Sequence, residues 1–418
     1  MSNPALPSEK VHTQCCIVGG GPAGMMLGLL LARSGVQVVV LEKHADFFRD
    51  FRGDTIHPST LELLYELGCL EEFLKVPHQP MSSLTVSING KIVDGPDFSH
   101  LPTHCKFVAF TPQWHFLDFI ARQGKRYPTF DLRMNAEAVG LIEENGRITG
   151  VKVDTLDHEI EIHADLVVGA DGRGSTVRQL AGMQVEDFGV PIDVLWFRLP
   201  KNANSPSGEP SFGYFKNGLM MILIDRGDYW QAAHIIPKGG LEELKSRSLE
   251  AFRQRIVDLV PIVGEAIQAV DDWDKVKLLS VQVNRLPQWS RPGLLCIGDC
   301  AHAMSPAGGI GVNIAIQDAV ATANLFAERL REEKLTDADL HLVQKRREWA
   351  IRWTQNVQLL LHRKLLNPAK IQKPGDDSLP LGPRLVGKIP FLRQLIARVV
   401  GIGFCPEHVR TSEYRPRA

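Results

Sequence analysis

The chain has 418 residues and a formal net charge of −1, so it is long enough for two domains and has no overall field that would draw it to nucleic acid or to an anionic membrane. Its seven cysteines include no C-x-x-C pair, which favours buried free thiols in a reducing compartment over disulfides or metal ligands. Because residues 1–10 lack the apolar core of a signal peptide and no apolar run approaches the roughly 18 residues of a membrane span, we expect a cytoplasmic protein with no integral membrane segment.

The first predicted unit is a buried strand that runs into a glycine-rich turn. Cys15 to Val18 is a short apolar run typical of a buried strand. Gly19, Gly21 and Gly24 then match the pattern G-x-G-x-x-G. In that pattern the first glycine allows a tight turn, the second lets the backbone approach a pyrophosphate, and the third lets the helix pack on the strand.

A helix, a second strand and an acidic residue complete this unit. The helix from about Pro22 to Arg33 should aim its free N–H groups and positive dipole end at phosphates. Val36 to Leu41 reads as the second parallel strand, and Glu42 follows at the distance where a carboxylate accepts the hydroxyls of a ribose. The combination favours a dinucleotide site over a chance glycine turn. Glu42 would repel a 2′-phosphate, which disfavours NADP here but leaves NAD and FAD both open.

Residues 44–170 alternate between helix and antiparallel strands. A helix is predicted from about Ser59 to Leu67, and residues 84–95 form a predicted hairpin with Asn89-Gly90 at its turn. From residue 138 we expect a meander of three antiparallel strands with its first turn at Asn145-Gly146, which runs into a fourth apolar strand, Leu166 to Ala170.

The pattern of elements in the second half of the chain predicts that the domain containing the glycine turn is discontinuous in sequence. Residues 190–237 are rich in strands, residues 241–270 are helical, residues 276–287 and 293–299 are strands, and the chain is mostly helical from about Asn313. The predicted fold class is therefore α/β. We expect a Rossmann-like domain of residues 11–76, 111–179 and 291–365, an inserted and mostly antiparallel β domain of residues 77–110 and 180–290, and a C-terminal helical tail of residues 366–418.

Two later motifs extend the expected ligand site. Asp171-Gly172 and Gly298-Asp299 each end an apolar strand, and a Pro/Gly loop after Asp299 leads to a helix that starts near Gly311–Asn313. An ordinary strand, turn and helix capped by Asp or Ser is the alternative interpretation of the first of these motifs. A simple NAD dehydrogenase needs only the first glycine loop, so three separated loops suggest a long ligand contacted along its whole length.

The three motifs together resemble those of the class A flavoprotein aromatic monooxygenases, over about residues 12–365. The resemblance implies one noncovalent FAD, reduced by NADPH or NADH that binds only transiently. It also implies a reaction with O₂ through a flavin C4a-hydroperoxide that hydroxylates an aromatic or phenol-like small molecule. Since the flavin carries the difficult chemistry, no catalytic side chain is assigned and no metal is expected. His302, in the loop after Asp299, is interpreted as structural.

The resemblance also assigns binding roles. Glu42 would hold the adenosine ribose, Asp171-Gly172 would lie near the pyrophosphate, and Asp299 would hold the ribityl chain. Arg52 matches an arginine near the phosphates, Gln113 matches a glutamine on the ribityl chain, and the backbone of residues 309–313 would meet the pyrimidine edge of the flavin. The predicted cofactor-binding residues are Gly19, Gly21, Pro22, Ala23, Gly24, Glu42, Lys43, Arg52, Gln113, Asp171, Gly172, Asp299, Gly309, Gly311, Val312 and Asn313.

Some features depart from the family pattern, and several functions stay open. Cys300 stands where a small residue is usual, and Gly309-Ile310 replaces a common Gly-Gln pair. The W-x-W-x-I-P motif of related halogenases is absent, which disfavours halogenation. An epoxidase, a quinone-precursor hydroxylase, an oxidase and a non-catalytic binder on this fold remain alternatives. Candidate substrate contacts on the inserted sheet are Trp196, Arg198, Tyr214, Met220, Tyr229, Trp230 and His234.

The tail contains one amphipathic helix. Its apolar face is expected to dock on the body of the protein, with a homodimer contact or a membrane surface as alternatives. The residues of that face are Phe391, Leu392, Leu395, Ile396, Val399 and Val400.

Overall fold

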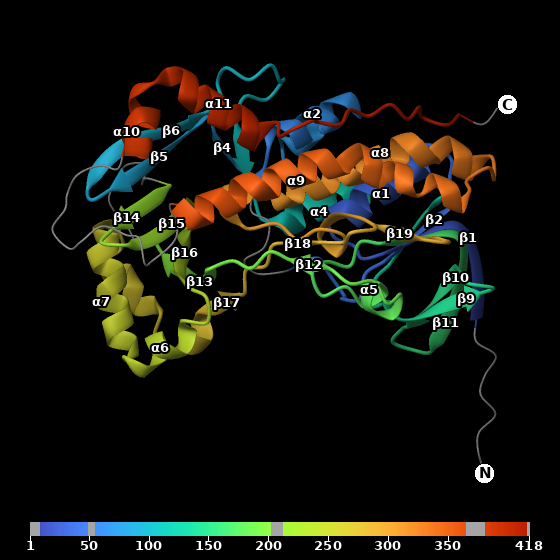
Figure 1. The fold of residues 1–418 in the computed structure, drawn as a ribbon, viewed down its shortest axis with the longest axis horizontal. Coiled ribbons are helices and arrows are strands. Elements are labelled where there is room, and N and C mark those ends of the chain that lie inside the picture. Colours follow the sequence, from blue (N-terminus) through green and yellow to red (C-terminus); the bar gives the residue numbers. More distant parts are fainter. Residues whose placement is uncertain (1–8, 49–54, 202–211, 365–380, 416–418) are drawn as a thin grey trace, which may run out of the picture.

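A computed structural model describes residues 9–48, 55–201, 212–364 and 381–415 (Figure 1). Within these ranges the chain forms an eight-stranded sheet and a seven-stranded sheet, with helices on their faces and at the C-terminal end. The predicted α/β class, with a Rossmann-like part, an inserted antiparallel sheet and C-terminal helices, is confirmed.

The eight-stranded sheet is parallel at its centre. Strand β1 pairs in parallel with β11 on one side and β2 on the other, and β8 and β20 extend the parallel part outward. The last residues of β1 and all of β2 are buried, as expected of strands covered on both faces. Its strands are β19 (Ser290–Arg291), β20 (Leu294–Cys296), β11 (Glu159–Gly169), β1 (Glu9–Val18), β2 (Val38–Leu41) and β8 (Phe130–Arg133), with β10 (Arg147–Asp154) and β9 (Glu137–Glu144) attached to β11.

One strand prediction in this region was wrong. The turn at Asn145-Gly146 is present, with both residues at positive φ, but the predicted third and fourth strands are one strand, β11. Its first half pairs with β10 and its whole length runs beside β1. The polar residues His163 and Asp165 interrupt the apolar run, yet the hydrogen bonding to β1 continues past them.

Helices cover both faces of this sheet. Cys15 packs in the core beside α1, α4 and α8, whereas Cys16 packs in the core that includes α5, so the two side chains face opposite ways as predicted. Helix α8 is the one described helix long and apolar enough to cross a membrane, but 67% of its apolar window is buried inside the protein, which accounts for its composition. The helices of this part are α1 (Pro22–Arg33), α2 (Pro58–Glu66), α3 (Leu70–Phe73), α4 (Gln113–Gly124), α5 (Thr176–Leu180), α8 (Gly311–Arg331) and the short 3-10 helices η3 (Gly298–Cys300), η4 (Ala307–Gly309) and η5 (Asp337–Asp339).

The second sheet combines strands from two distant parts of the chain. The hairpin of β5 and β6 turns at Asn89-Gly90, as predicted, and β5 pairs with β14. In order, the strands are β17 (Lys277–Leu279), β13 (Ile192–Pro200), β16 (Tyr229–Pro237), β15 (Leu219–Asp225), β14 (Gly213–Lys216), β5 (Ser83–Ile88) and β6 (Lys91–Asp97). Two small sheets join the large ones: β12 (Glu186–Asp187) with β18 (Asn284–Arg285), and β3 (Thr55–Ile56) with β7 (Val108–Phe110) and β4 (Gln79–Met81).

Two predicted elements of the inserted part are shorter than expected. The helical stretch 241–270 breaks at Ser248, which has a φ of 88°, and again at Pro261. The predicted strand 276–287 holds only β17 and β18, because the residues between them pair with no strand. The broken stretch contains α6 (Leu241–Ser246), α7 (Leu249–Leu259) and η1 (Pro261–Ala269), followed by η2 (Trp273–Lys275).

The longest of the C-terminal helices, α9 (His341–Lys364), reaches both sheets (Figure 1). Helix α9 contributes Val343 and Ile351 to the core of the first sheet, and Leu359 packs against the second. After residues 365–380, which lie outside the described residues, the chain forms α10 (Leu381–Lys388) and α11 (Pro390–Gly401).

Helix α11 docks on the body, but not through the whole predicted face. Ala397 is fully buried against Phe98 and Leu101, whereas Phe391 and Leu395 are 68% and 46% exposed. Residues 403–415, which we call the C-terminal strap, then run along α2 and α8 to the carboxyl end of α1, where Tyr414 N donates to Arg33 O.

Candidate functional site

The motifs found in the sequence meet at one edge of the first sheet. Strands β2, β1, β11 and β20 are neighbours and run in the same direction. Glu42 and Gly19 follow directly after the carboxyl ends of β2 and β1, and Asp171 and Asp299 follow within three residues of the ends of β11 and β20. Ligands of open α/β sheets bind outside this edge, so the fold brings together groups that are far apart in sequence.

The three glycines of the turn have different surroundings, which explain the absence of a side chain in different ways. Gly19 has a φ of +113°, and a Cβ there would lie 2.4 Å from Ala170 O. A Cβ on Gly24 would lie 2.0 Å from Gly19 O, so this glycine is required for helix α1 to pack on β1. A Cβ on Gly21 would meet nothing within 4 Å. The second glycine therefore borders open space at the amino terminus of α1, where an anion can approach.

Pro22 and Ala23 form the first turn of α1. Pro22 occupies a first-turn position of the helix, where its missing N–H costs nothing. Ala23 is buried, and a Cβ on Gly298 would lie 3.3 Å from its side chain. The first and third motifs therefore touch each other.

Glu42 and Lys43 end β2 with different partners. The Glu42 carboxylate accepts from the backbone N–H of Gly20 at 3.2 Å and of His44 at 3.0 Å. It is thus fixed beside the glycine turn. Lys43 forms a 3.5 Å ion pair with Glu137, and both side chains are about half exposed.

Asp171 caps a helix and still has an oxygen to spare. Its Oδ2 accepts from Val177 N at 3.1 Å, and Ser175 Oγ accepts from Arg178 N at 2.9 Å, so the capping interpretation is correct for α5. The other oxygen, Oδ1, is buried and has no hydrogen-bond partner among the described residues. A buried acceptor of this kind normally has a partner, which fits a ligand beside Gly172.

Sequence reasoning missed the arginine that joins the second and third motifs. Arg173 Nε donates to Asp299 Oδ2 at 2.9 Å, and its Nη2 donates to Met304 O at 3.1 Å. Its Nη1 is buried without a hydrogen-bond partner among the described residues. The position of Arg173 directly after Asp171-Gly172 was the available signal. Arg178, which donates to Cys300 O, supports the same loop.

The last motif residues form the start of α8. Gly309 has a φ of +63°, and its carbonyl accepts from Thr55 Oγ1 at 3.0 Å. The Asn313 side chain is buried and accepts from His57 N and Thr60 Oγ1, so it faces α2. Within the described part of the chain, no side-chain cap is formed at the start of α8, where Gly311 and the half-buried Val312 lie. An uncapped helix start favours negative charge.

The structure gives less information about two predicted cofactor contacts, Gln113 and Arg52. Gln113 is the half-buried first residue of α4. The next residue, Trp114, has its ring 4.8 Å from that of Phe48, which puts this helix start beside the segment that follows Glu42. Arg52 lies outside the described residues.

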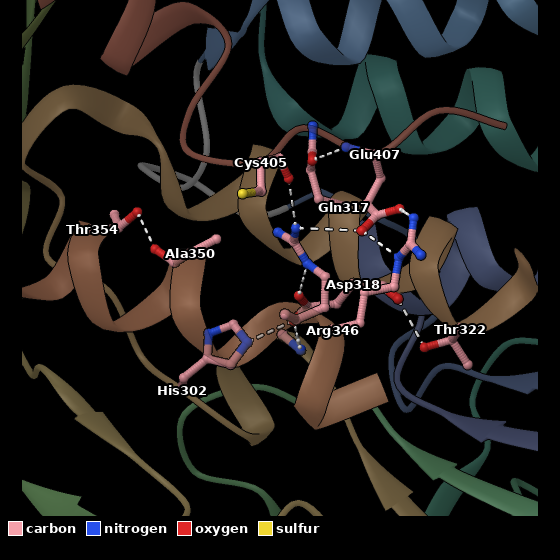
Figure 2. Close-up of polar contacts among 11 residues, drawn as sticks. His302, Gln317, Asp318, Thr322, Arg346, Ala350, Thr354, Cys405 and Glu407 are labelled. Carbon is pink, nitrogen blue, oxygen red and sulfur yellow. Dashed lines mark hydrogen bonds and ion pairs between the residues drawn. The ribbon is translucent and has the colours of Figure 1, made fainter. Parts of the chain in front are cut away.

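A buried charged network supports the loop from behind (Figure 2). His302 Nε2 donates to Asp318 at 2.6 Å, and Arg347 Nε donates to the same carboxylate at 3.0 Å. Glu407 of the C-terminal strap accepts from Arg346 through both oxygens, and its backbone N–H donates to Gln317. Burial alone would raise the pKa of Asp318, but attraction to His302 and Arg347 outweighs it and lowers that pKa.

The cysteines are free thiols, and the prediction that they are buried holds for all but Cys405. Cys300, where the family has a small residue, is buried with its thiol 3.1 Å from Ser175 Oγ. Burial, with the neighbouring Cys296, raises the pKa of the Cys300 thiol well above its ordinary value. It therefore packs beneath the loop as an unreactive thiol.

The candidate substrate contacts divide between two faces of the second sheet. Tyr214, Trp230 and His234 lie on the face covered by α7 and η1; Trp230 and His234 are buried there, so these three are not substrate contacts. Trp196 packs with Ile222 on the other face, between the clusters that contain Phe110 and Leu359. By strand alternation Arg198, Met220 and Tyr229 share that face, and Arg198 lies 5.1 Å from the Tyr229 ring.

Comparisons with known proteins identify the family of the chain. A family model described as an FAD binding domain matches residues 12–357. The 6-methylpretetramide 4-monooxygenase of Streptomyces rimosus is 32% identical over 403 residues, which are 95% of this chain and 94% of that protein.

Solved structures show the same fold at lower identity. The p-nitrophenol 4-monooxygenase PnpA of Pseudomonas putida superposes with a TM-score of 0.75 and 18% identity, over 93% of this chain and 97% of that one. The probable FAD-dependent monooxygenase pqsL of Pseudomonas aeruginosa gives a TM-score of 0.72 and 22% identity, over 86% and 98%.

Proposed function

Because the chain belongs to the FAD-dependent aromatic monooxygenases, we propose that the edge formed by Gly19, Glu42, Asp171 and Asp299 binds one FAD along its whole length. The observation that carries this proposal is the open space above Gly21 together with the buried, unpartnered Oδ1 of Asp171 on the neighbouring strand end. Both are what a dinucleotide needs at the carboxyl edge of a parallel sheet.

Each group on this edge has a distinct task toward FAD. The N–H groups at the start of α1 bind the pyrophosphate, Glu42 accepts ribose hydroxyls, and Asp299 accepts a ribityl hydroxyl. Arg173 brings a positive charge between the second and third motifs, where its unpartnered Nη1 leaves a donor for the ligand. The uncapped start of α8 stabilises negative charge on the reduced ring. When bound, FAD takes a hydride from NADPH or NADH and activates O₂ for transfer of one oxygen atom.

The substrate is proposed to lie against the face of the second sheet that carries Trp196 and Ile222. This face is apolar and is shared with Phe110 and Leu359, which suits an aromatic compound in a pocket poor in water. The relative that matches nearly the full chain acts on 6-methylpretetramide, and PnpA acts on p-nitrophenol. We propose that this enzyme prefers the first compound or one like it, since that similarity is the stronger of the two.

Several features of organisation belong to the same proposal. The second sheet, with residues 77–110 and 180–290, is the substrate domain, and residues 11–76, 111–179 and 291–365 form the FAD-binding domain. We place the enzyme in the cytoplasm because its cysteines are free. A homodimer is a further proposal, and the exposed Phe391 and Leu395 of α11 are the surface that would contribute to it.

The test is substrate-stimulated reduction of the flavin. Purified enzyme should carry FAD that is released intact on denaturation. Under anaerobic conditions, 6-methylpretetramide should speed flavin reduction by NADPH or NADH at least about tenfold, or about 1.4 kcal/mol, whereas p-nitrophenol should do less. With O₂ present, the product should gain one oxygen atom by mass. A colourless protein that FAD does not reconstitute would contradict the proposal, and so would NAD(P)H oxidation that yields only peroxide with every aromatic compound tried.

A further inference from the structure

The loop from Ser305 to Gly309, which leads into α8, is held by a glutamine that the sequence did not single out. Gln358 of α9 is 2% exposed. Its Oε1 accepts from Ser305 N at 3.0 Å, and its Nε2 donates to Ser305 O and to Ala307 O, both at 3.0 Å. One side chain therefore fixes three backbone groups of the loop.

His362, one turn further along α9, completes this contact. Its Nε2 shares a 2.7 Å hydrogen bond with Ser305 Oγ, which also accepts from Ala307 N at 3.1 Å. His362 is fully buried, and burial lowers its pKa, so the ring is neutral at neutral pH. Ser305 is thus bonded at its backbone nitrogen, its backbone oxygen and its hydroxyl.

The far end of the loop is fixed independently. Thr55 Oγ1 donates to Gly309 O at 3.0 Å, and a Cβ on Gly309 would lie 2.5 Å from that hydroxyl. Between these two anchors Gly308 is exposed and has a φ of +82°. The direction of the α8 start, and of its uncapped N–H groups, is therefore set by Gln358 on one side and Thr55 on the other.

We propose that Gln358, assisted by His362, is a positioning residue for the flavin end of the cofactor site. It acts through Ser305 and Ala307, and the group it positions is the amino terminus of α8. This inference rests on the proposed placement of FAD along the four strand ends. Because the α8 start stabilises the negative charge that forms on reduction, a displaced loop lowers the reduction potential and slows hydride transfer more than it weakens FAD binding.

A matched pair of variants tests this. Gln344 lies on the same helix and also uses both ends of its side chain: it accepts from Trp289 N at 3.0 Å and donates to Pro287 O at 2.8 Å. It does not touch the loop. With substrate saturating, Gln358→Ala should slow anaerobic flavin reduction about 10- to 100-fold, as expected for a misplaced group, with a more negative flavin potential. The KM for NAD(P)H should change less than about twofold. Gln344→Ala should leave both the rate and the potential within about twofold of wild type.

A second variant gives a signature that a general packing role would not. In Gln358→Glu the ionised carboxylate still accepts from Ser305 N but cannot donate to the two carbonyls, whereas the protonated acid can donate to one of them. Reduction should therefore be impaired at high pH and recover as the pH falls. The charged or titratable described groups around this loop are His362 on Ser305 and Arg173 on Met304, together with Arg285 on Gln355 of the same helix. The control for this variant is Gln344→Glu. Because wild type and this control contain the same charged groups, only Gln358→Glu should regain its rate of flavin reduction as the pH falls.

The outcomes distinguish failure of the positioning role from failure of the proposed function. If wild type binds FAD and hydroxylates its substrate, but Gln358→Ala behaves as Gln344→Ala and Gln358→Glu shows no recovery, the positioning role is wrong and the proposed function stands. If wild type does not bind FAD, the proposed function itself is wrong. Should Gln358→Ala not fold, the pH profile of Gln358→Glu decides the inference alone.

Discussion

Asp299 and Asp318 lie on either side of the same loop, yet their surroundings differ. The Asp299 side chain is 30% exposed and is paired with Arg173. The Asp318 side chain is fully buried and accepts from Gly298 N, His302 and Arg347. A carboxylate that is partly exposed and has one partner among the described residues can accept a ligand hydroxyl. A buried carboxylate that already has three donors is committed to holding the loop and the C-terminal strap together.

The difference shows that an acidic residue does not contact the cofactor merely because it lies beside the loop. Burial and the number of donors already present decide the role.

The largest effect is expected where the buried network is broken. Asp318→Asn removes the negative charge beside Arg347, and loss of one partner of a buried ion pair typically costs about 3–5 kcal/mol. Urea unfolding at neutral pH should show this loss of the free energy of unfolding. Asp299→Asn is the control and should lose less than about 1 kcal/mol. A small loss for Asp318→Asn would mean that Glu407, which lies 3.7 Å from Arg347, replaces it.

Acid should next destabilise the protein through buried neutral histidines before it affects Asp318. Burial lowers the pKa of His57 and of His234 from 6.5 to about 4. Since the folded pKa lies below the unfolded one, the folded state keeps its full stability above pH 6.5 and loses it as the pH falls toward 4. Each histidine contributes on the order of 3 kcal/mol across this window.

The check is a pair of unfolding curves near pH 7 and near pH 4.5. His57→Gln should flatten the decline by up to about half, because the unfolded variant no longer takes up that proton, while His234 and His362, whose pKa values burial also lowers, still contribute. Because attraction to His302 and Arg347 lowers the pKa of Asp318, its contribution is lost only as the pH falls below the ordinary carboxyl range. Identical pH dependence in wild type and His57→Gln would contradict this assignment.

A smaller and more specific effect is expected at Asp299. A hydrogen bond from a ligand hydroxyl to a carboxylate is worth about 1.5–3 kcal/mol, so Asp299→Ala should weaken FAD binding about 10- to 150-fold with the fold retained. Fluorescence titration of the apoprotein with FAD measures this, and circular dichroism checks the fold. Unchanged affinity in a folded variant would show that Arg173, rather than the ligand, is the purpose of this carboxylate.

The smallest effect is expected at Lys43, which tests whether exposure near the site is sufficient. Its ion pair with Glu137 is 3.5 Å long and half exposed, and such pairs contribute about 0–1 kcal/mol. Lys43→Ala should therefore change FAD affinity at most about fivefold. A loss as large as that of Asp299→Ala would make Lys43 a phosphate contact and would remove the distinction based on existing partners.

Much of the fold and of the cofactor edge was predictable because it depends on local chemistry. Gly19 and Gly24 are required by a tight turn and a close helix approach, and Asn89-Gly90 and Asn145-Gly146 by turns of positive φ. The predicted strand boundaries were wrong where pairing with a distant strand decided where a strand begins and ends. Strand β11 continues past polar residues because β1 bonds to it, whereas the pairing of β17 with β13 ends at Leu279, and Val281 N donates to the Asp193 side chain instead.

The sequence by itself determined the ligand type. It did so through three motifs at strand ends, and each motif is recognisable from the strand before it and the helix after it. The tertiary structure alone decided which groups surround those motifs. Arg173 reaches Asp299, Gln358 reaches Ser305, and Glu407 reaches Arg346 only when the chain is folded. Each of these contacts joins residues more than fifty positions apart, and no local pattern encodes them. Their physical basis is burial: a polar group enclosed by the fold must find a partner wherever the packing brings one.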